Sequence, residues 1–253
     1  MTSDDRTTIL ITGASSGLGA EMARQFAAKG NDLALCARRT DRLESLREEI
    51  LAAHPDRRVE VRALDVNDHD QVFEVFRAFA SDFGTIDRVV INAGLGKGAP
   101  LGTGRFDANR DTAMTNFVGA LAQSEAAMEV FRAQGSGHFV MISSMSAMRG
   151  MPKELATYAA TKAGVAHLAE GLRMELLGKP IKVTVIYPGY IASEMNEGVA
   201  AEQPLMVSTE KGVRAMVDAI EKEKDSACVP PLPWAPLSVL MKHAPMPLYK
   251  KLI

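Results

Sequence analysis

The chain alternates short apolar runs with amphipathic stretches from its first residues almost to its last, and this alternation restricts the fold more than any other feature. Most of the apolar runs are continuous, which is typical of strands buried on both faces of a parallel sheet. The stretches between them are expected to be helices that cover the sheet. We therefore predict a single α/β domain over residues 1–253, a Rossmann-like doubly wound parallel sheet with helices on both faces.

The pattern also gives the expected order of the elements. Strands are predicted at 8–12, 32–37, 59–64, 86–92, 138–143 and 181–187, with a brief one at 227–229. Helices are predicted at 17–29, 41–53, 68–83, 107–134 and 158–177. No segment resembles a linker or a repeat.

Composition excludes several classes of protein. Hydrophobic residues make up 47% of the 253 residues, and the formal charge of -2 predicts no attraction to nucleic acid. The two cysteines are too few for a disulfide framework, and the five histidines lack the spacing of metal ligands, so no metal is expected. The polar N-terminus MTSDDRTT does not resemble a signal peptide, and no apolar run is long enough to span a membrane. We expect a cytoplasmic protein.

The stretch TGASSGLG lies between the first predicted strand and the first predicted helix. Glycines at this position permit a tight turn and let the backbone approach a pyrophosphate, which the amides of the helix N-terminus then face. The strand before it and the helix after it make a dinucleotide-binding loop more probable than a turn that binds nothing. The predicted loop residues are Gly13, Ser15, Ser16, Gly17, Leu18 and Gly19.

The end of the second strand predicts which dinucleotide binds. A carboxylate there receives the ribose hydroxyls of NAD, but this chain has Ala37 followed by Arg38 and Arg39. Guanidinium groups bind a 2′-phosphate through charge-assisted hydrogen bonds, so we predict a preference for NADP(H) over NAD(H). Arg38 is the stronger candidate, because neighbouring loop residues can point apart. Alternatively, both arginines are solvated loop residues.

TGASSGLG is followed by NAG at Asn92, Ala93 and Gly94, by YAATK from Tyr158 to Lys162, and by PG at Pro188 and Gly189. In this order the motifs resemble the classical branch of the short-chain dehydrogenase/reductase (SDR) superfamily. The resemblance implies a nucleotide site that also includes Asp65, Val66, Ile191 and Ser193, where Ser193 replaces the family's usual threonine. The extended branch of sugar-nucleotide epimerases differs, because its middle glycine would stand at Ser16.

The same resemblance implies a catalytic group formed by Asn116, Ser144, Tyr158 and Lys162. Tyr158 would be the acid/base, with its pKa lowered by Lys162 and by the oxidised nicotinamide. Ser144 would stabilise charge on the substrate oxygen, and Asn116 would support a proton path to Lys162. Tyr158 follows Ser144 by 14 positions, one more than usual in the family, so Ser143 or Ser146 remains an alternative to Ser144.

The substrate region is less informative. The candidate substrate residues are Met145, Met151, Tyr190 and Met195, and the candidate lid is 194–207. Methionine side chains suit an adaptable apolar pocket, but they are equally common as filling in an apolar core. An apolar substrate is weakly favoured.

Residues 230–253 form a Pro-rich apolar extension with a cationic end. It could pack over the chain's own pocket, on a partner subunit or on a membrane surface. Membrane contact is the least favoured, because the apolar stretch 237–241 is short. The resemblance implies a homodimer or homotetramer, with the two long helices as the usual interface.

These observations and the resemblance together predict an NADP(H)-dependent oxidoreductase that interconverts a ketone or aldehyde and an alcohol by hydride transfer. The preference for NADP(H) favours reduction, so a carbonyl reductase is expected. The alternative is a non-catalytic NADP(H)-binding sensor or scaffold on the same fold. Such a protein would not need Asn116, Ser144, Tyr158 and Lys162 together. An epimerase or dehydratase is opposed by the glycine spacing.

Overall fold

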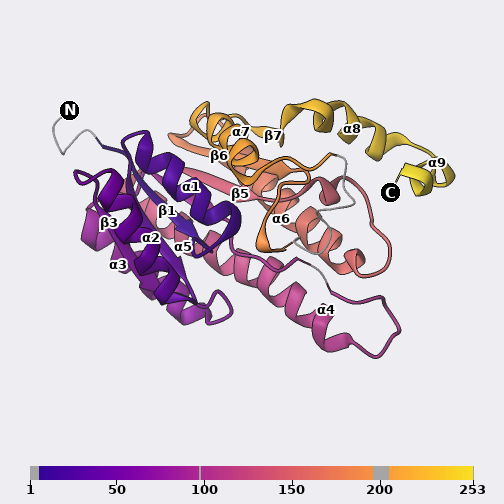
Figure 1. The fold of residues 1–253 in the computed structure, drawn as a ribbon, viewed down its shortest axis with the longest axis horizontal. Coiled ribbons are helices and arrows are strands. Elements are labelled where there is room, and N and C mark those ends of the chain that lie inside the picture. Colours follow the sequence, from indigo (N-terminus) through magenta and orange to yellow (C-terminus); the bar gives the residue numbers. More distant parts are fainter. Residues whose placement is uncertain (1–5, 97, 196–204, 253) are drawn as a thin grey trace.

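The computed structural model describes residues 6–96, 98–195 and 205–252 (Figure 1). Seven parallel strands form one sheet in the order β3-β2-β1-β4-β5-β6-β7, which confirms the predicted doubly wound sheet. The order reverses between β1 and β4, and ligands bind at such a switch point in open α/β sheets. The strands are β1 (Thr8–Thr12), β2 (Asp32–Ala37), β3 (Val59–Ala63), β4 (Arg88–Ile91), β5 (Gly137–Ile142), β6 (Ile181–Pro188) and β7 (Ser226–Val229).

Helices cover both faces of the sheet. Successive side chains of β1 point to opposite faces, so Ile9 and Ile11 pack with α1, α2 and α7, whereas Leu10 packs with α3, α5 and α6. Both cores therefore depend on continuous apolar strands. The α-helices are α1 (Gly17–Ala28), α2 (Thr40–Ala53), α3 (His69–Phe83), α4 (Phe106–Ala113), α5 (Gly119–Gln134), α6 (Leu155–Glu175), α7 (Thr209–Glu221), α8 (Pro231–His243) and α9 (Met246–Leu252).

The long helix predicted at 107–134 is not uniform. A π-helical segment, Met114–Val118, separates α4 from α5. Such segments widen a helix locally and are frequent at functional sites. Asn116 lies within this segment, so its side chain leaves the helix where the turn is widened.

Helix α7 is absent from the elements predicted above, although its sequence carries the usual signals. The hydroxyl of Ser208 caps the helix by accepting a hydrogen bond from the amide of Lys211 at 3.3 Å. Val213, Met216 and Ile220 then lie at helical spacing and are fully buried against the sheet.

The Pro-rich extension forms helices α8 and α9 at the β7 edge of the sheet (Figure 1). Trp234, Met241 and Tyr249 are buried from this segment and form a third, smaller apolar cluster with Met145. Arg149 holds the segment from the other side, because its guanidinium donates to the carbonyls of Met241 and Ala244. The extension therefore packs on the loop that follows Ser144.

None of the described helices is both long and apolar enough to cross a membrane.

Candidate active site

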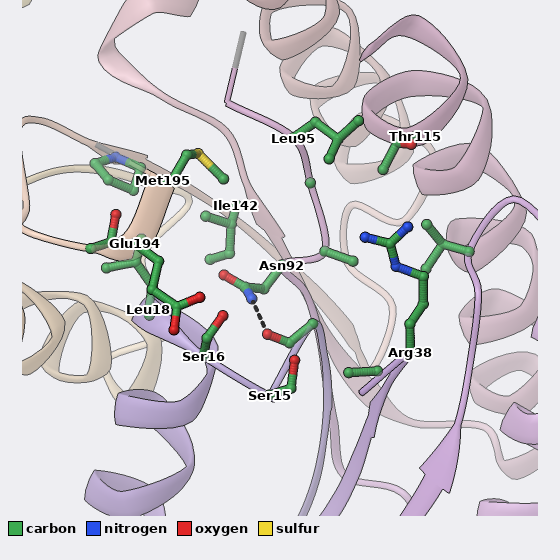
Figure 2. A pocket seen from close by; sticks show the side chains of 18 of the residues that line it. Ser15, Ser16, Leu18, Arg38, Asn92, Leu95, Thr115, Ile142, Glu194 and Met195 are labelled. Carbon is green, nitrogen blue, oxygen red and sulfur yellow. Dashed lines mark hydrogen bonds between the residues drawn. The ribbon is translucent and has the colours of Figure 1, made fainter. Parts of the chain in front are cut away.

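A cleft opens at the carboxyl ends of β1 to β6, over the switch point between β1 and β4 (Figure 2). It collects most of the residues predicted from sequence, although they come from loops far apart in the chain. The predicted residues that line it are Gly13, Ser15, Ser16, Gly17, Leu18, Arg38, Arg39, Asp65, Val66, Asn92, Ala93, Gly94, Ser144, Tyr158, Lys162, Pro188, Gly189, Ile191, Ser193 and Met195.

The loop between β1 and α1 requires its glycines. Gly13 and Gly17 have φ of 65° and 53°, in the region that side chains disfavour. A Cβ on Gly13 would lie 2.8 Å from the Cα of Ala93, and one on Gly19 would lie 2.4 Å from the carbonyl oxygen of Gly13. The loop therefore sits close to β4 and leaves the backbone amides at the start of α1 facing the cleft.

Asn92 fastens this loop to the neighbouring strand. Its side-chain amide donates to the carbonyls of Thr12 at 3.0 Å and Gly13 at 3.3 Å. The Thr12 hydroxyl in return accepts from the amides of Asn92 at 3.1 Å and Ala93 at 3.2 Å. These bonds hold the glycine loop and the NAG segment as one wall of the cleft.

The two arginines after β2 differ in their contacts. Arg38 has no hydrogen bond or ion pair with any residue in the described part of the chain, and Figure 2 shows its guanidinium extending into the cleft. Arg39 bends over the glycine loop, where it donates to the hydroxyls of Ser16 at 2.6 Å and Ser15 at 3.3 Å. It also pairs with Glu194 at 3.3 Å. Both arginines therefore line the end of the cleft beside β2, where Arg39 already has partners and Arg38 has none among the described residues.

Ser144 is the serine that meets Tyr158. A hydrogen bond between the two side chains favours the phenolate, whereas burial favours the neutral phenol and has the larger effect, so the pKa of Tyr158 is raised. Ser143 is engaged elsewhere, because its hydroxyl donates to the carbonyl of Lys162 at 2.8 Å. Ser146 donates its amide to the Ser144 hydroxyl at 3.1 Å and does not line the cleft.

Lys162 lies one helical turn after Tyr158 on α6. Its Nζ donates to the carbonyl of Ile142 at 2.9 Å and lies 6.0 Å from the centre of the Tyr158 ring. Burial lowers the pKa of Lys162 to about 8, so the ammonium still predominates at neutral pH. Without a bound dinucleotide, burial therefore keeps the pKa of Tyr158 above its ordinary value. The lowering expected from Lys162 together with the oxidised nicotinamide stays a prediction.

Asn116 lies behind the cleft and does not line it. Its carboxamide accepts from the Leu95 amide at 2.6 Å and donates to the Leu95 carbonyl at 2.9 Å. A Cβ on Gly94 would lie 3.1 Å from Asn116 Oδ1 and 3.6 Å from Lys162 Nζ, so these two groups border the same point of the backbone. The Asn116 side chain also donates to the Thr161 hydroxyl of α6 at 3.4 Å, so it joins the segment after β4 to α6.

The segment after β6 closes the cleft from the other side. Ile191 lies just before the candidate lid and pairs in a β-bridge with Val207, the last residue of the lid. Residues 196–204 of the lid lie outside the described part of the chain. Glu194 reaches across the cleft and pairs with Arg42 at 2.5 Å and with Arg39. Glu194 was not among the site residues predicted from the sequence. Its position directly after Ser193 in the segment that follows Pro188 and Gly189 could have indicated it.

The candidate substrate residues separate into two groups. Met195 lines the cleft, whereas Met145, Met151 and Tyr190 pack in the apolar cluster with α8 and α9. Tyr190 meets Trp234 edge to face, with ring centroids 5.4 Å apart. Trp234 was not among the predicted site residues, yet its indole lies directly against Gly189.

The arrangement fits a nicotinamide dinucleotide. The glycine loop leaves a cradle that a Cβ would obstruct, Arg38 extends into the cleft without a partner among the described residues, and an acid/base pair lies at the other end. The loop and α1 would hold the pyrophosphate, Asp65 and Val66 the adenine, and Lys162 with the segment from Pro188 to Ser193 the nicotinamide end.

The sequence and the fold of this chain are similar to those of known short-chain dehydrogenases. The family model described as short chain dehydrogenase matches residues 7–204. An uncharacterized oxidoreductase of Mycobacterium tuberculosis is 54% identical over 241 residues, which cover 95% of each chain. Levodione reductase is 27% identical, with a TM-score of 0.79 over 88% of this chain and 94% of that chain. A short chain dehydrogenase from Burkholderia cenocepacia, solved with NADP, shares the fold with a TM-score of 0.82 over 98% of each chain at 23% identity.

Proposed function

The chain belongs to the short-chain dehydrogenase/reductase family of oxidoreductases, and from this premise we propose that it is an NADP(H)-dependent enzyme that interconverts a ketone or aldehyde and the corresponding alcohol. The observation that carries the proposal is the convergence of Ser144, Tyr158 and Lys162 at one end of a cleft whose other end presents Arg38 and Arg39. A protein that only bound the dinucleotide would not need the first three side chains.

The chain's own groups are suited to carbonyl reduction. The cofactor, when bound, supplies the hydride. Ser144 donates a hydrogen bond to the carbonyl oxygen as negative charge develops there, and Tyr158 gives that oxygen a proton. Burial keeps Tyr158 protonated, as a proton donor must be, and its hydrogen bond with Ser144 orients the phenol. Lys162 keeps a positive charge beside the phenolate that remains, and Asn116 holds the adjacent backbone.

Replacing Tyr158 by phenylalanine tests the catalytic part of the proposal. Y158F removes the proton donor but leaves the ring that fills the site, so turnover should fall by at least about a hundredfold while NADPH affinity stays nearly unchanged. Turnover is measured as NADPH oxidation with a panel of ketones, aldehydes, quinones and steroids, and affinity by NADPH fluorescence. Y187F is the matched control, because Tyr187 is a half-buried tyrosine of β6 outside the cleft.

The outcomes are distinct. Full turnover by Y158F would remove Tyr158 from the chemistry. Tight NADPH binding by the wild-type chain with no turnover across the whole panel would favour the sensor or scaffold alternative.

The preference for NADP(H) depends on Arg38 and Arg39. R38D places a carboxylate where the 2′-phosphate would lie and should shift the NADPH-to-NADH ratio of kcat/KM toward NADH by roughly tenfold to thousandfold. The control is R47D on α2, which changes the same charge outside the cleft. An unchanged ratio in R38D would mean that Arg38 does not contact the cofactor.

The chain is further inferred to form a homodimer through its long helices. Met114, Phe117 and Leu121 leave apolar side chains partly exposed along the junction of α4 and α5, and Phe117 packs against Gly164 of α6. L121D should shift the molecular mass measured by light scattering from dimer to monomer. An unchanged mass would place the interface elsewhere.

A further inference from the structure

Helix α8 is apolar on both of its faces. Its inner face buries Trp234 and Met241 against the loop after Ser144. Its outer face leaves Val239 60% exposed, with Leu240 beside it. Leu232, which precedes a kink and has a non-helical backbone, is 75% exposed. A helix that is hydrophobic all round is normally buried on all sides, so the outer face of α8 has the composition of a contact surface.

Helix α9 carries further exposed apolar side chains. It follows α8 after a short turn, and Met246 is 63% exposed with Leu248 also exposed. In Figure 1 both helices lie beyond the β7 edge of the sheet, next to the point where the chain ends. We call the exposed apolar side chains of the two helices the tail face; they are Leu232, Val239, Leu240, Met246 and Leu248.

The charge of this segment is opposite to that of the chain. From Ser226 to Ile253 the sequence contains three lysines and no aspartate or glutamate, whereas the whole chain has a formal charge of -2. Lys242, at the end of α8, and Lys250, in α9, are exposed beside the tail face. The segment therefore combines an exposed apolar surface with a positive charge that no acidic residue of the segment neutralises.

We propose that the tail face docks on the surface of an anionic lipid bilayer. In this geometry the apolar side chains enter the boundary between headgroups and acyl chains, and the lysines reach the lipid phosphates. A second copy of the chain fits less well, because a twofold interface places a surface against itself and would bring lysines together without an acidic partner from the segment.

Docking would also bring the substrate side of the cleft toward the lipid. The inner face of the same helices packs on Met145, directly after Ser144, and on Tyr190, directly after Gly189. A ketone dissolved in the bilayer would then enter beside the residues that reduce it. This last step rests on the proposed function, whereas the docking itself does not.

The test is co-sedimentation of the full chain with vesicles of phosphatidylcholine alone or of equal parts phosphatidylcholine and phosphatidylglycerol. We expect sedimentation with the anionic vesicles only, weakened by added salt. Neutralising Lys242 and Lys250 with K242Q and K250Q should weaken binding roughly fivefold for each lysine. V239S with L240S should weaken it roughly tenfold or more, because these side chains would no longer enter the apolar boundary.

The controls separate docking from folding and from catalysis. L177S removes an apolar side chain that is 83% exposed after α6, and it should sediment like the wild-type chain. V239S with L240S should keep wild-type NADPH affinity and the wild-type unfolding midpoint, because neither side chain is buried. No sedimentation of the wild-type chain, or equal sedimentation of the double variant, would overturn the proposal. A change of molecular mass in the double variant without any lipid binding would assign the tail face to a second copy instead.

Discussion

Gly189 and Trp234 are in such close contact that a single methyl group at position 189 should displace the indole. A Cβ built on Gly189 would lie 2.0 Å from Cε2, 2.1 Å from Nε1 and 2.5 Å from Cδ2 of Trp234. Carbon atoms in contact prefer about 3.5–4.0 Å, so the ring must shift by more than about 1 Å. The ring is 4% exposed and is held by Tyr190, which leaves it little room to move.

The magnitude follows from two opposing effects. Overpacking of this kind costs about 1–3 kcal/mol. Gly189 is not among the glycines with positive φ, so alanine fits the backbone and by itself would stabilise the chain by about 0.4–1 kcal/mol. We expect G189A to lower the free energy of unfolding by about 1–2 kcal/mol.

A double-mutant cycle isolates the contact. W234A should cost about 3–5 kcal/mol by itself, but it empties the space that the new methyl group needs. G189A should then stabilise the W234A background by about 0.4–1 kcal/mol, so the coupling energy equals the overpacking cost alone, about 1–3 kcal/mol. Because Trp234 is the single tryptophan of the chain, unfolding in urea should be followed by far-UV circular dichroism. Equal costs of G189A in both backgrounds would refute the assigned contact.

Three further predictions concern the cleft and the sheet. E194Q removes the carboxylate that pairs with Arg39, so the guanidinium becomes available to the cofactor phosphate. NADPH binding should become several-fold tighter in fluorescence titrations, whereas weaker binding would show that Glu194 helps to hold the cofactor. Burial and the nearby Arg88 lower the pKa of His138 from 6.5 to about 3 in the folded chain. Between pH 6.5 and pH 3 the unfolded chain therefore binds a proton that the folded chain does not, and the free energy of unfolding decreases as the pH falls through this range. The loss between pH 7.5 and pH 5 should be about 2 kcal/mol in urea unfolding and should be absent in H138Q; equal slopes would rule out His138 as the cause. G13A places a methyl group on a residue with a left-handed backbone, next to the backbone of Ala93. It should weaken NADPH binding at least about tenfold in the same fluorescence titration, and unchanged affinity would contradict the assigned loop geometry.

Local patterns in the sequence were sufficient for most elements of the fold. Local patterns located all seven strands to within about two residues. Most were continuous apolar runs, because a strand buried on both faces has little freedom in composition, whereas β3 was located by its alternation. The helix at 209–221 was missed although Ser208, Val213 and Met216 carried its cap and its periodicity. The π-helical turn around Asn116 has no comparable local signal, because it depends on how the helix packs.

The sequence by itself determined the chemistry available to the site: a glycine loop after the first strand, two arginines after the second, and a tyrosine and lysine one helical turn apart. Tertiary structure alone decided how these groups are used. It selected Ser144 over Ser143, since only packing shows that the Ser143 hydroxyl is taken by the Lys162 carbonyl. It also placed Met145 and Met151 under the C-terminal helices, away from the cleft. The physical reason is that strands and helices show themselves within one segment, through apolar residues that recur every two or about 3.6 positions. A contact between segments far apart in the chain depends instead on how the two segments pack together.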